Sequence, residues 1–310
     1  MENCKQPSAF DFFKRFPDED SARLYLEKAR WPNGIVCLNC QHNDVWKIRG
    51  GKIYTCKKCR TQFTIRTGTV MEDSKLSLQK WIYAMYLMTT ARKGISSIQL
   101  SKELGITQKS AWFVEHRIRE SCKSSGLLTG TVEVDETYIG GKEKNKHKDK
   151  KLHAGRGAVG KSIVFGVKSR EGETQAKVIS GTTKEHLGEA ITESVAEGAI
   201  LYSDDFKSYT DLAKYHHETV NHSGGEYVRG DAHINSIESF WAILKRAHMG
   251  TFHHWSKKHL DRYVQEFVFK ANTVNLPAFD KTGTDCGATT IRAHVAGMVG
   301  RRLTYKELIS

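Results

Sequence analysis

The sequence predicts an α/β protein in which a mixed sheet with flanking helices follows a cysteine-paired module and a helical region. Three observations predict this order: two Cys-x-x-Cys pairs near the N-terminus, apolar residues at helical spacing after residue 76, and strand-like and helical runs after residue 127. A chain of 310 residues is long enough for a full-sized core with one or two smaller modules. We therefore expect divisions at 1–69, 70–126, 127–276 and 277–310, the last being a C-terminal tail.

The composition points to a polyanionic partner. The chain contains 48 Lys and Arg residues and 35 Asp and Glu residues, so the formal net charge is +13. Nucleic acid fits this charge better than a membrane does, because no run of 18 or more apolar residues exists and no basic amphipathic anchor stands out. The N-terminus lacks the apolar core of a signal peptide, and four of the seven cysteines fall into two close pairs. We expect a cytoplasmic, reduced protein that does not bind membranes.

The two cysteine pairs predict a zinc ribbon. Cys37 and Cys40 form the first pair, Cys56 and Cys59 form the second, and 15 residues separate the pairs (56 − 40 − 1). This is the spacing of a four-thiolate zinc site, in which each pair presents two sulfurs at one turn and a hairpin brings the turns together. Four buried cysteines without metal are the alternative, and they are rare at this spacing. Between residues 37 and 66 the chain carries seven Lys or Arg against one acid, which favours DNA contact over a purely structural role.

The helical region contains two short helices with a turn between them. Gly105 provides the turn, and Thr107 can cap the second helix. The arrangement resembles a helix-turn-helix, whose second helix would enter a major groove. We expect Gln108 and Lys109, at the start of that helix, to contact DNA. An ordinary helical hairpin is the alternative, because the motif is short and degenerate.

The stretch TVEVDETYIGG, residues 131–141, predicts a strand with a carboxylate in its middle. Read with period 2, one face carries Val132, Val134 and Tyr138, and the other carries Glu133, Asp135 and Thr137. Burial of a carboxylate without a partner is costly, so an acid in a β-branched strand usually marks a functional site. The alternative is the exposed face of an edge strand.

The next elements predict a sheet of RNase H type. Two strand-like runs at 162–168 and 175–180 are followed by a helix ending at Gly198 and a short apolar strand at 199–203. That last strand delivers Asp204 and Asp205 at its C-terminal end. Carboxylates at strand ends of such a sheet lie in the crevice where ligands bind.

A later helix offers the third acid. Glu238 and Lys245 are seven residues apart, and two helical turns take about 7.2 residues, so both project from one side. Asn235, three residues before Glu238, shares that side. A surface Glu–Lys helix is the alternative for this segment taken alone.

A basic loop follows the acidic strand. Residues 142–161 contain eight Lys or Arg and two acids, and few apolar side chains. Such a run is often a solvated face, but beside an acidic site on a DNA-handling protein it is suited to gripping phosphates. The residues that we expect to do so are Lys144, Lys146, Lys148, Lys150 and Lys151.

Taken together, these segments resemble the DDE transposases of prokaryotic insertion sequences, in the superfamily with an N-terminal zinc ribbon. The matching segments are VEVDETYIGGK, LYSDDFKSY, VNHSGGEYVRGDAHINSIESFWAILKR, GTFHHWSKKHLDRYVQEFVFKAN and RRLTYKEL. They cover most of the chain from the ribbon to the C-terminus. The resemblance implies that Asp135, Asp204 and Glu238 form the acidic triad, and that Lys245 is the basic residue placed after the glutamate.

Two assignments have alternatives. The resemblance places the second aspartate directly after a small hydroxyl residue, here Ser203, which favours Asp204 over Asp205. Some relatives use an asparagine as the third ligand, so Asn235 is an alternative to Glu238. A charged oxygen holds a divalent cation better than an amide does, which favours Glu238.

The resemblance implies metal-dependent DNA cleavage at element ends, followed by attack of the freed 3′-hydroxyl on target DNA. Two Mg²⁺ or Mn²⁺ ions roughly 3.5–4 Å apart serve such in-line displacements. The partners would be double-stranded DNA, both terminal inverted repeats and target, and further copies of the chain assembled on it. Two other functions remain open: a DNA-binding regulator with an inactive RNase H-like domain, and a metal-dependent nuclease without strand transfer.

Overall fold

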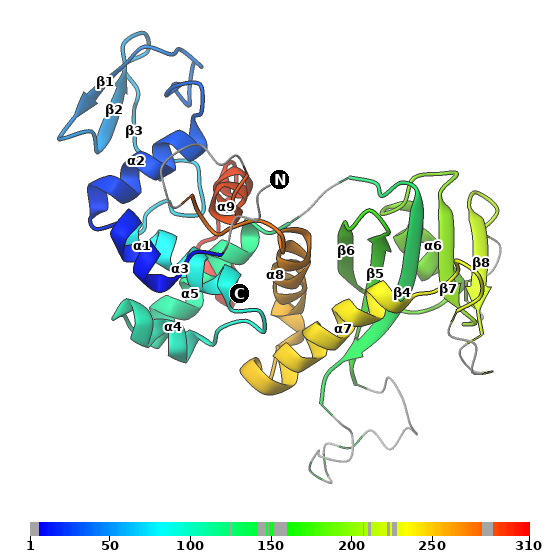
Figure 1. The fold of residues 1–310 in the computed structure, drawn as a ribbon. Coiled ribbons are helices and arrows are strands. Elements are labelled where there is room, and N and C mark those ends of the chain that lie inside the picture. Colours follow the sequence, from blue (N-terminus) through cyan, green and yellow to red (C-terminus); the bar gives the residue numbers. More distant parts are fainter. Residues whose placement is uncertain are drawn as a thin grey trace. The chain divides into compact units, whose positions relative to one another are not determined.

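The computed structural model describes residues 6–123, 126–141, 160–206, 228–280 and 288–310, together with 147, 149, 151, 208, 209, 212–221 and 224. The chain divides into two compact units (Figure 1). Unit 1 consists of Met1–Lys123 and Asn275–Ser310, and unit 2 of Ser124–Val274. Unit 2 is therefore continuous in sequence and is inserted between the two segments of unit 1.

Unit 1 begins with two helices and the ribbon. Helices α1 (Ala9–Arg15) and α2 (Glu19–Arg30) each start at a capping box, which satisfies the first free N–H groups. An antiparallel sheet follows, in which β2 (Ile53–Cys56) lies between β1 (Val45–Ile48) and β3 (Gln62–Phe63). Glu27 of α2 accepts hydrogen bonds from Tyr54 Oη at 2.6 Å and Lys47 Nζ at 2.8 Å, which fixes the ribbon to α2.

The two helices and the turn predicted after the ribbon are present. Helix α3 (Leu78–Thr90) is followed by α4 (Ser97–Leu104) and α5 (Gln108–Glu120). Gly105 ends α4 in the left-handed conformation at φ 58°, and the Thr107 side chain caps α5 through the Ser110 N–H. Both features match the turn and the cap that the sequence predicts.

The segment 277–310, expected as a tail, carries α9 (Thr290–Met298) and α10 (Tyr305–Ile309) within unit 1. Helix α9 packs directly on the C-terminal end of α5. A Cβ atom built on Gly297 would lie 2.1 Å from the carbonyl oxygen of Ser121, so only glycine permits this approach. The Ser121 hydroxyl also lies 2.7 Å from Nδ1 of the buried His294. These contacts make α9 an integral part of the core of unit 1.

Unit 2 is built on a mixed sheet, as the sequence predicts, and the sheet has a fifth strand, β8, that the sequence analysis did not identify. The strands are β4 (Thr131–Ile139), β5 (Ser162–Ser169), β6 (Thr174–Ile179), β7 (Ile200–Asp204) and β8 (His216–Val220). Their order is β6-β5-β4-β7-β8. The pairs β4–β5 and β5–β6 are antiparallel, whereas β4–β7 and β7–β8 are parallel. Strand β4, which carries the acidic residues, is therefore central, and the edge-strand alternative is excluded.

Helices cover both faces of the sheet (Figure 1). Val132 and Val134 of β4 pack with α6 (Lys184–Thr192) on one face. The other face packs against α7 (Asn235–Ala247) and α8 (Leu260–Asn272), which are joined through a π-helical turn (His248–Phe252) and a 3₁₀ turn (Lys257–His259). Among the described residues, no helix has the length and apolar character needed to cross a membrane.

Candidate functional site

The ribbon brings its four cysteines together as predicted. The sulfurs of Cys37, Cys40, Cys56 and Cys59 all lie within 4.8 Å of one another, with Cys37–Cys59 at 3.5 Å and Cys40–Cys56 at 3.6 Å. A tetrahedral zinc ion with Zn–S bonds of about 2.3 Å has sulfur–sulfur edges of roughly 3.8 Å. The group is therefore already close to the geometry of a four-thiolate zinc site, and it forms the structural zinc site of the ribbon.

The two cysteine turns have the same backbone form. Gln41 and Arg60, each directly after the second cysteine of a pair, adopt left-handed φ values of 57° and 61°. Their N–H groups donate to the carbonyls of Cys37 and Cys56 at 3.0 Å and 3.1 Å. Hydrogen bonding with Thr61 lowers the pKa of Cys59 to about 5. Against a hydrogen bond from the His42 backbone, burial and the neighbouring thiols raise the pKa of Cys40 to about 12, so the four sulfurs do not ionise alike without a metal ion.

In unit 2 the sheet brings Asp135 and Asp204 side by side. Strands β4 and β7 run parallel, with Glu133 paired to Tyr202. Continuing this register by two residues places Asp204 beside Asp135. Asp204 is the last residue of β7 and is half-buried, whereas Asp205 lies beyond the strand and is exposed. The strand end therefore presents Asp204, and not Asp205, to Asp135.

The electrostatic environment of this pair is strongly acidic. Burial, with added repulsion from Glu136 and Asp204, raises the pKa of Asp135 to about 7. Burial and Asp204 also raise the pKa of Glu136, although a hydrogen bond from Tyr209 Oη at 2.6 Å acts in the opposite direction. Carboxylates crowded in a partly dry site favour a bound cation. The sequence did not single out Glu136 or Tyr209, because their contact joins two segments far apart in the chain.

Helix α7 contacts the acidic pair through Trp241. Its indole Nε1 donates to Asp135 Oδ2 at 3.0 Å, while the Glu136 N–H donates to the other carboxylate oxygen at 2.9 Å. Gly166 of β5 is paired opposite Asp135, and a Cβ atom there would lie 2.5 Å from the Trp241 ring. Glycine at this position therefore leaves the space through which the indole reaches the aspartate.

The third acidic candidate, Glu238, lies on α7. Glu238 and Asn235 are in the first turn of α7, Lys245 is in the last, and all three side chains are exposed. Within the described part of the chain, only the four cysteines form a group of possible ligands that all lie within 4.8 Å of one another. Asp135, Asp204 and Glu238 therefore do not form a group in which all ligand atoms lie within 4.8 Å of one another.

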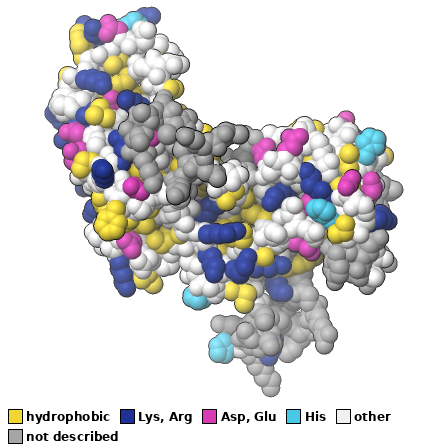
Figure 2. All heavy atoms as spheres, viewed as in Figure 1, with side chains coloured by type: hydrophobic (Ala, Val, Ile, Leu, Met, Phe, Trp, Pro, Cys, Tyr) yellow, Lys and Arg dark blue, Asp and Glu magenta, His cyan; other side chains and the backbone are white. Residues whose placement is uncertain are grey.

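The predicted DNA contacts are only partly described. Gln108 and Lys109 are exposed in the first turn of α5, with Gln108 Nε2 2.7 Å from Ser97 Oγ and Lys109 Nζ 4.5 Å from the Tyr305 ring centre. Of the loop lysines, Lys151 is half-buried outside any helix or strand. The other four lie outside the described residues: Lys144, Lys146, Lys148 and Lys150. On the face drawn in Figure 2, Lys and Arg side chains occur over both units, with a group of them around α7 and α8.

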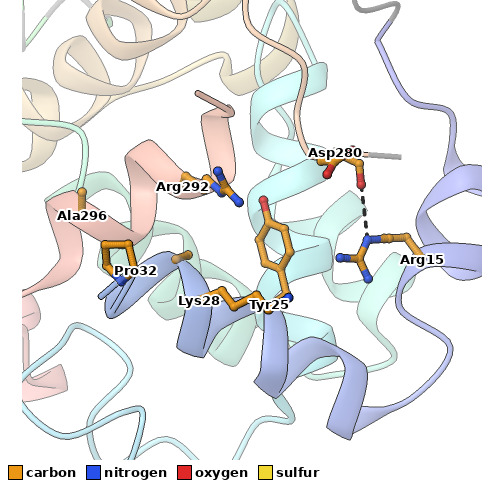
Figure 3. A pocket seen from close by; sticks show the side chains of 8 residues that line it. Arg15, Tyr25, Lys28, Pro32, Asp280, Arg292 and Ala296 are labelled. Carbon is orange, nitrogen blue, oxygen red and sulfur yellow. Dashed lines mark hydrogen bonds between the residues drawn. The ribbon is translucent and has the colours of Figure 1, made fainter. Parts of the chain in front are cut away.

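Unit 1 also contains a basic hollow of about 550 Å³ between α1, α2 and α9. Arg15, Lys28 and Arg292 line it from these three helices, and Figure 3 shows the two arginines on opposite sides of Tyr25. Arg15 Nε donates to the backbone carbonyl of Asp280 at 3.3 Å, which orients its guanidinium. Three cationic side chains against the one carboxylate of Asp280 give the hollow the charge to accept an anion.

Comparison with known proteins places these features in a family context. A model described as the ISXO2-like transposase domain matches residues 127–272, and one described as the transposase zinc-ribbon domain matches residues 17–62. A protein of Halobacterium salinarum, described as an uncharacterized protein in transposable element ISH50, is 30% identical over 283 residues. That match covers 85% of this chain and 94% of the Halobacterium protein.

Proposed function

This chain belongs to the family of ISXO2-like transposases, and we propose on that premise that it cuts DNA at the ends of its own element and joins the freed 3′-hydroxyl groups to target DNA. The observation that supports the proposal is the proximity of Asp135 and Asp204, which lie on adjacent parallel strands and interact electrostatically. The raised pKa of Asp135, about 7, supports it, because the aspartate lies in surroundings with too little positive charge.

The carboxylates fit a pair of divalent cations. Asp135 and Asp204 would hold them, with Glu238 as the third ligand, because Mg²⁺ and Mn²⁺ prefer a few convergent carboxylate oxygens. When bound, two such ions activate the attacking oxygen and stabilise the leaving oxygen of an in-line displacement. Glu238 lies on α7, the helix whose Trp241 contacts Asp135, and we propose that it completes the ligand set when metal and DNA bind.

Other residues of the chain would orient these groups and the DNA. The Trp241 indole and the Glu136 N–H each donate to one oxygen of Asp135, and these contacts would orient the carboxylate for a ligand. Lys245, on the same side of α7 as Glu238, would bind a DNA phosphate next to the carboxylates.

The remaining basic groups would hold the DNA. Contacts of Gln108 and Lys109 with bases would give sequence preference, whereas the loop lysines would contact phosphates without reading sequence. The hollow lined by Arg15, Lys28 and Arg292 offers a further place for a backbone phosphate. Because a transposing element has two ends, we expect several copies of the chain to assemble on DNA.

The test compares isosteric variants for cleavage of a duplex carrying the element's terminal sequence. Asp135→Asn, Asp204→Asn and Glu238→Gln should each lose at least about a thousandfold in cleavage rate, because weakened metal binding removes several kcal/mol of transition-state stabilisation. Gel-shift affinity for the same duplex should change little, since these residues are proposed to hold metal and not DNA.

Two variants serve as matched controls: Asp205→Asn, the exposed neighbour of Asp204, and Asn235→Ala, one turn before Glu238. Both should cleave within about threefold of the wild type, as expected for surface changes without a metal contact. Loss of cleavage in Asn235→Ala with activity kept in Glu238→Gln would transfer the third ligand to Asn235. Cleavage without any joined product would contradict strand transfer and favour a nuclease.

A further inference from the structure

Glu133, two residues before Asp135 on β4, is a fully buried carboxylate that contacts the start of α7. Its Oε2 accepts hydrogen bonds from the backbone N–H groups of Ser236 at 2.8 Å and Ile237 at 3.0 Å. The residue that precedes α7 is Ile234, and its side chain makes no capping hydrogen bond to the helix. The first N–H groups of a helix lack partners within it, so Glu133 caps α7 from a neighbouring strand.

The second oxygen of Glu133 forms an ion pair with Arg170, although it accepts no hydrogen bond from the described residues. Oε1 lies 3.0 Å from Arg170 Nε and 3.3 Å from His233 Nδ1. Arg170 Nη2 also donates to the carbonyl oxygens of Asp231 at 2.8 Å and His233 at 3.4 Å. One guanidinium therefore holds both the Glu133 carboxylate and the segment that leads into α7.

These contacts determine where the third acidic residue lies along β4. Ser236 and Ile237, whose N–H groups Glu133 binds, directly precede Glu238. Glu133 and Asp135 are on the same face of β4, and Trp241 contacts Asp135 one turn further along α7. The helix is thus tied to the strand at two points on either side of Glu238, and both ties end on β4 carboxylates.

A capped helix does not by itself require such a residue. A serine or aspartate just before the helix would satisfy the N–H groups, whereas burial of a carboxylate costs several kcal/mol unless it is well paired. Glu133 differs from a cap within the helix in one respect, because it fixes the start of α7 to a defined position along β4. Its main effect is therefore on how α7 is placed against the strand, and not on the stability of the helix.

We propose that Glu133 is a positioning residue for the DNA-cleaving site, which sets Glu238 relative to Asp135 by fixing the start of α7 against β4. The proposal rests on the carboxylate site proposed above. Groups that orient metal ligands from behind typically change metal affinity by about 10- to 100-fold when lost.

The experiment uses two readouts on the full, zinc-loaded chain with Glu133→Gln, which keeps the shape of the side chain and removes its charge. The indole ¹⁵N–¹H resonance of Trp241, assigned by its loss in Trp241→Phe, reports the position of α7 over Asp135 without any metal. It should shift or split in Glu133→Gln. The affinity for Mn²⁺, measured by calorimetry with Asp135→Ala defining the site, should fall about 10- to 100-fold.

Glu173→Gln is the matched control, because Glu173 is an exposed acid just beyond the Arg170 turn, and both readouts should stay at wild-type values. Arg170→Gln, which leaves the two N–H contacts of Glu133 in place, should move both readouts in the same direction by less, and it decides the question if Glu133→Gln fails to fold. A lowered melting temperature with an unchanged indole resonance and unchanged Mn²⁺ affinity would show that Glu133 is only structural. If wild-type protein and Asp135→Ala bind Mn²⁺ alike, the proposed cleavage site fails, and the indole resonance still decides the positioning role.

Discussion

The two candidate metal sites of this protein are built in opposite ways. The ribbon site takes four ligands from a segment in which the first and last cysteines are 22 residues apart, and its sulfurs are already at tetrahedral spacing. The carboxylate site takes its candidate ligands from two strands and a helix, with Glu238 103 positions after Asp135 in the chain (238 − 135), and these ligand atoms do not all lie within 4.8 Å of one another.

The difference reflects what each site must do. A structural zinc site is closed by four protein ligands, whereas a catalytic site keeps positions open for substrate. In the ribbon, local turns with left-handed residues after each pair are sufficient to assemble the ligands. In unit 2 the candidate ligands lie on separate elements, and a contact from another element, such as that of Trp241 with Asp135, orients them.

The largest effect should come from loss of a zinc ligand in the ribbon. Cys37→Ser should remove the zinc and unfold the ribbon, because metal binding supplies about 10–16 kcal/mol of apparent folding free energy in such modules. Elemental analysis should fall from one zinc per chain to none, while the Trp241 indole resonance in unit 2 stays in place. Cys122→Ser, a buried cysteine of unit 1 outside the cluster, should keep its zinc. Full zinc content in Cys37→Ser would refute the four-thiolate assignment.

The carboxylate site of unit 2 and the zinc site of the ribbon should depend on pH in opposite directions. The folded pKa of Asp135 is about 7 against an ordinary value of 3.8, so between these values the folded state binds more protons than the unfolded state. Without divalent cations, the free energy of unfolding of unit 2 should therefore fall as pH rises from about 4 to 7, by up to about 4 kcal/mol. Asp135→Asn should flatten this dependence, and Mn²⁺ should restore stability at pH 8. The ribbon should instead lose zinc as pH falls, because its ligands are thiolates.

Thermal melting of zinc-loaded protein without other metals, from pH 5 to 8, tests this contrast. Parallel curves for the wild type and Asp135→Asn would show that Asp135 does not carry the raised pKa.

The smallest effect should come from loss of the hydrogen bond that Trp241 donates to Asp135. Trp241→Phe removes the hydrogen bond to Asp135 and should weaken Mn²⁺ binding by roughly 5- to 10-fold, since one such bond contributes about 1–1.5 kcal/mol. Trp255→Phe is the control: Trp255 is buried in the same unit, and its indole N–H has no hydrogen-bond partner among the described residues. Equal Mn²⁺ affinities in the two variants would mean that the indole contributes only by packing.

The sequence predicted those features whose cause is local. Cysteine spacing, the Gly105 turn, the Thr107 cap and the alternation of β4 all act over a few residues, and the structure contains each of them. The sequence also predicted a mixed sheet with Asp204 at a strand end, but the parallel pairing of β4 with β7 is known only from the structure.

The features that the sequence did not predict depend on distant partners. The sequence placed Glu133 among three polar residues on one face of a strand. The residues near it in the chain do not indicate that its carboxylate accepts hydrogen bonds from the first N–H groups of α7. The need for glycine at position 166 is apparent only from the structure, in which the Trp241 ring lies beside it. The segment after Pro277 is rich in Gly and Thr, so helix α9 and its contact with α5 were not foreseen.

The dependence of unit 1 on α9 has a consequence for the order in which the protein matures on the ribosome. Unit 2 is one continuous segment, so it can fold as soon as Val274 has emerged, whereas unit 1 must wait for α9 to reach the end of α5. From Lys123 to Thr290 the ribosome adds 167 residues (290 − 123), which takes roughly 10–30 s at about 5–20 residues per second. The sheet that carries the carboxylates is therefore complete before the module that is proposed to read DNA.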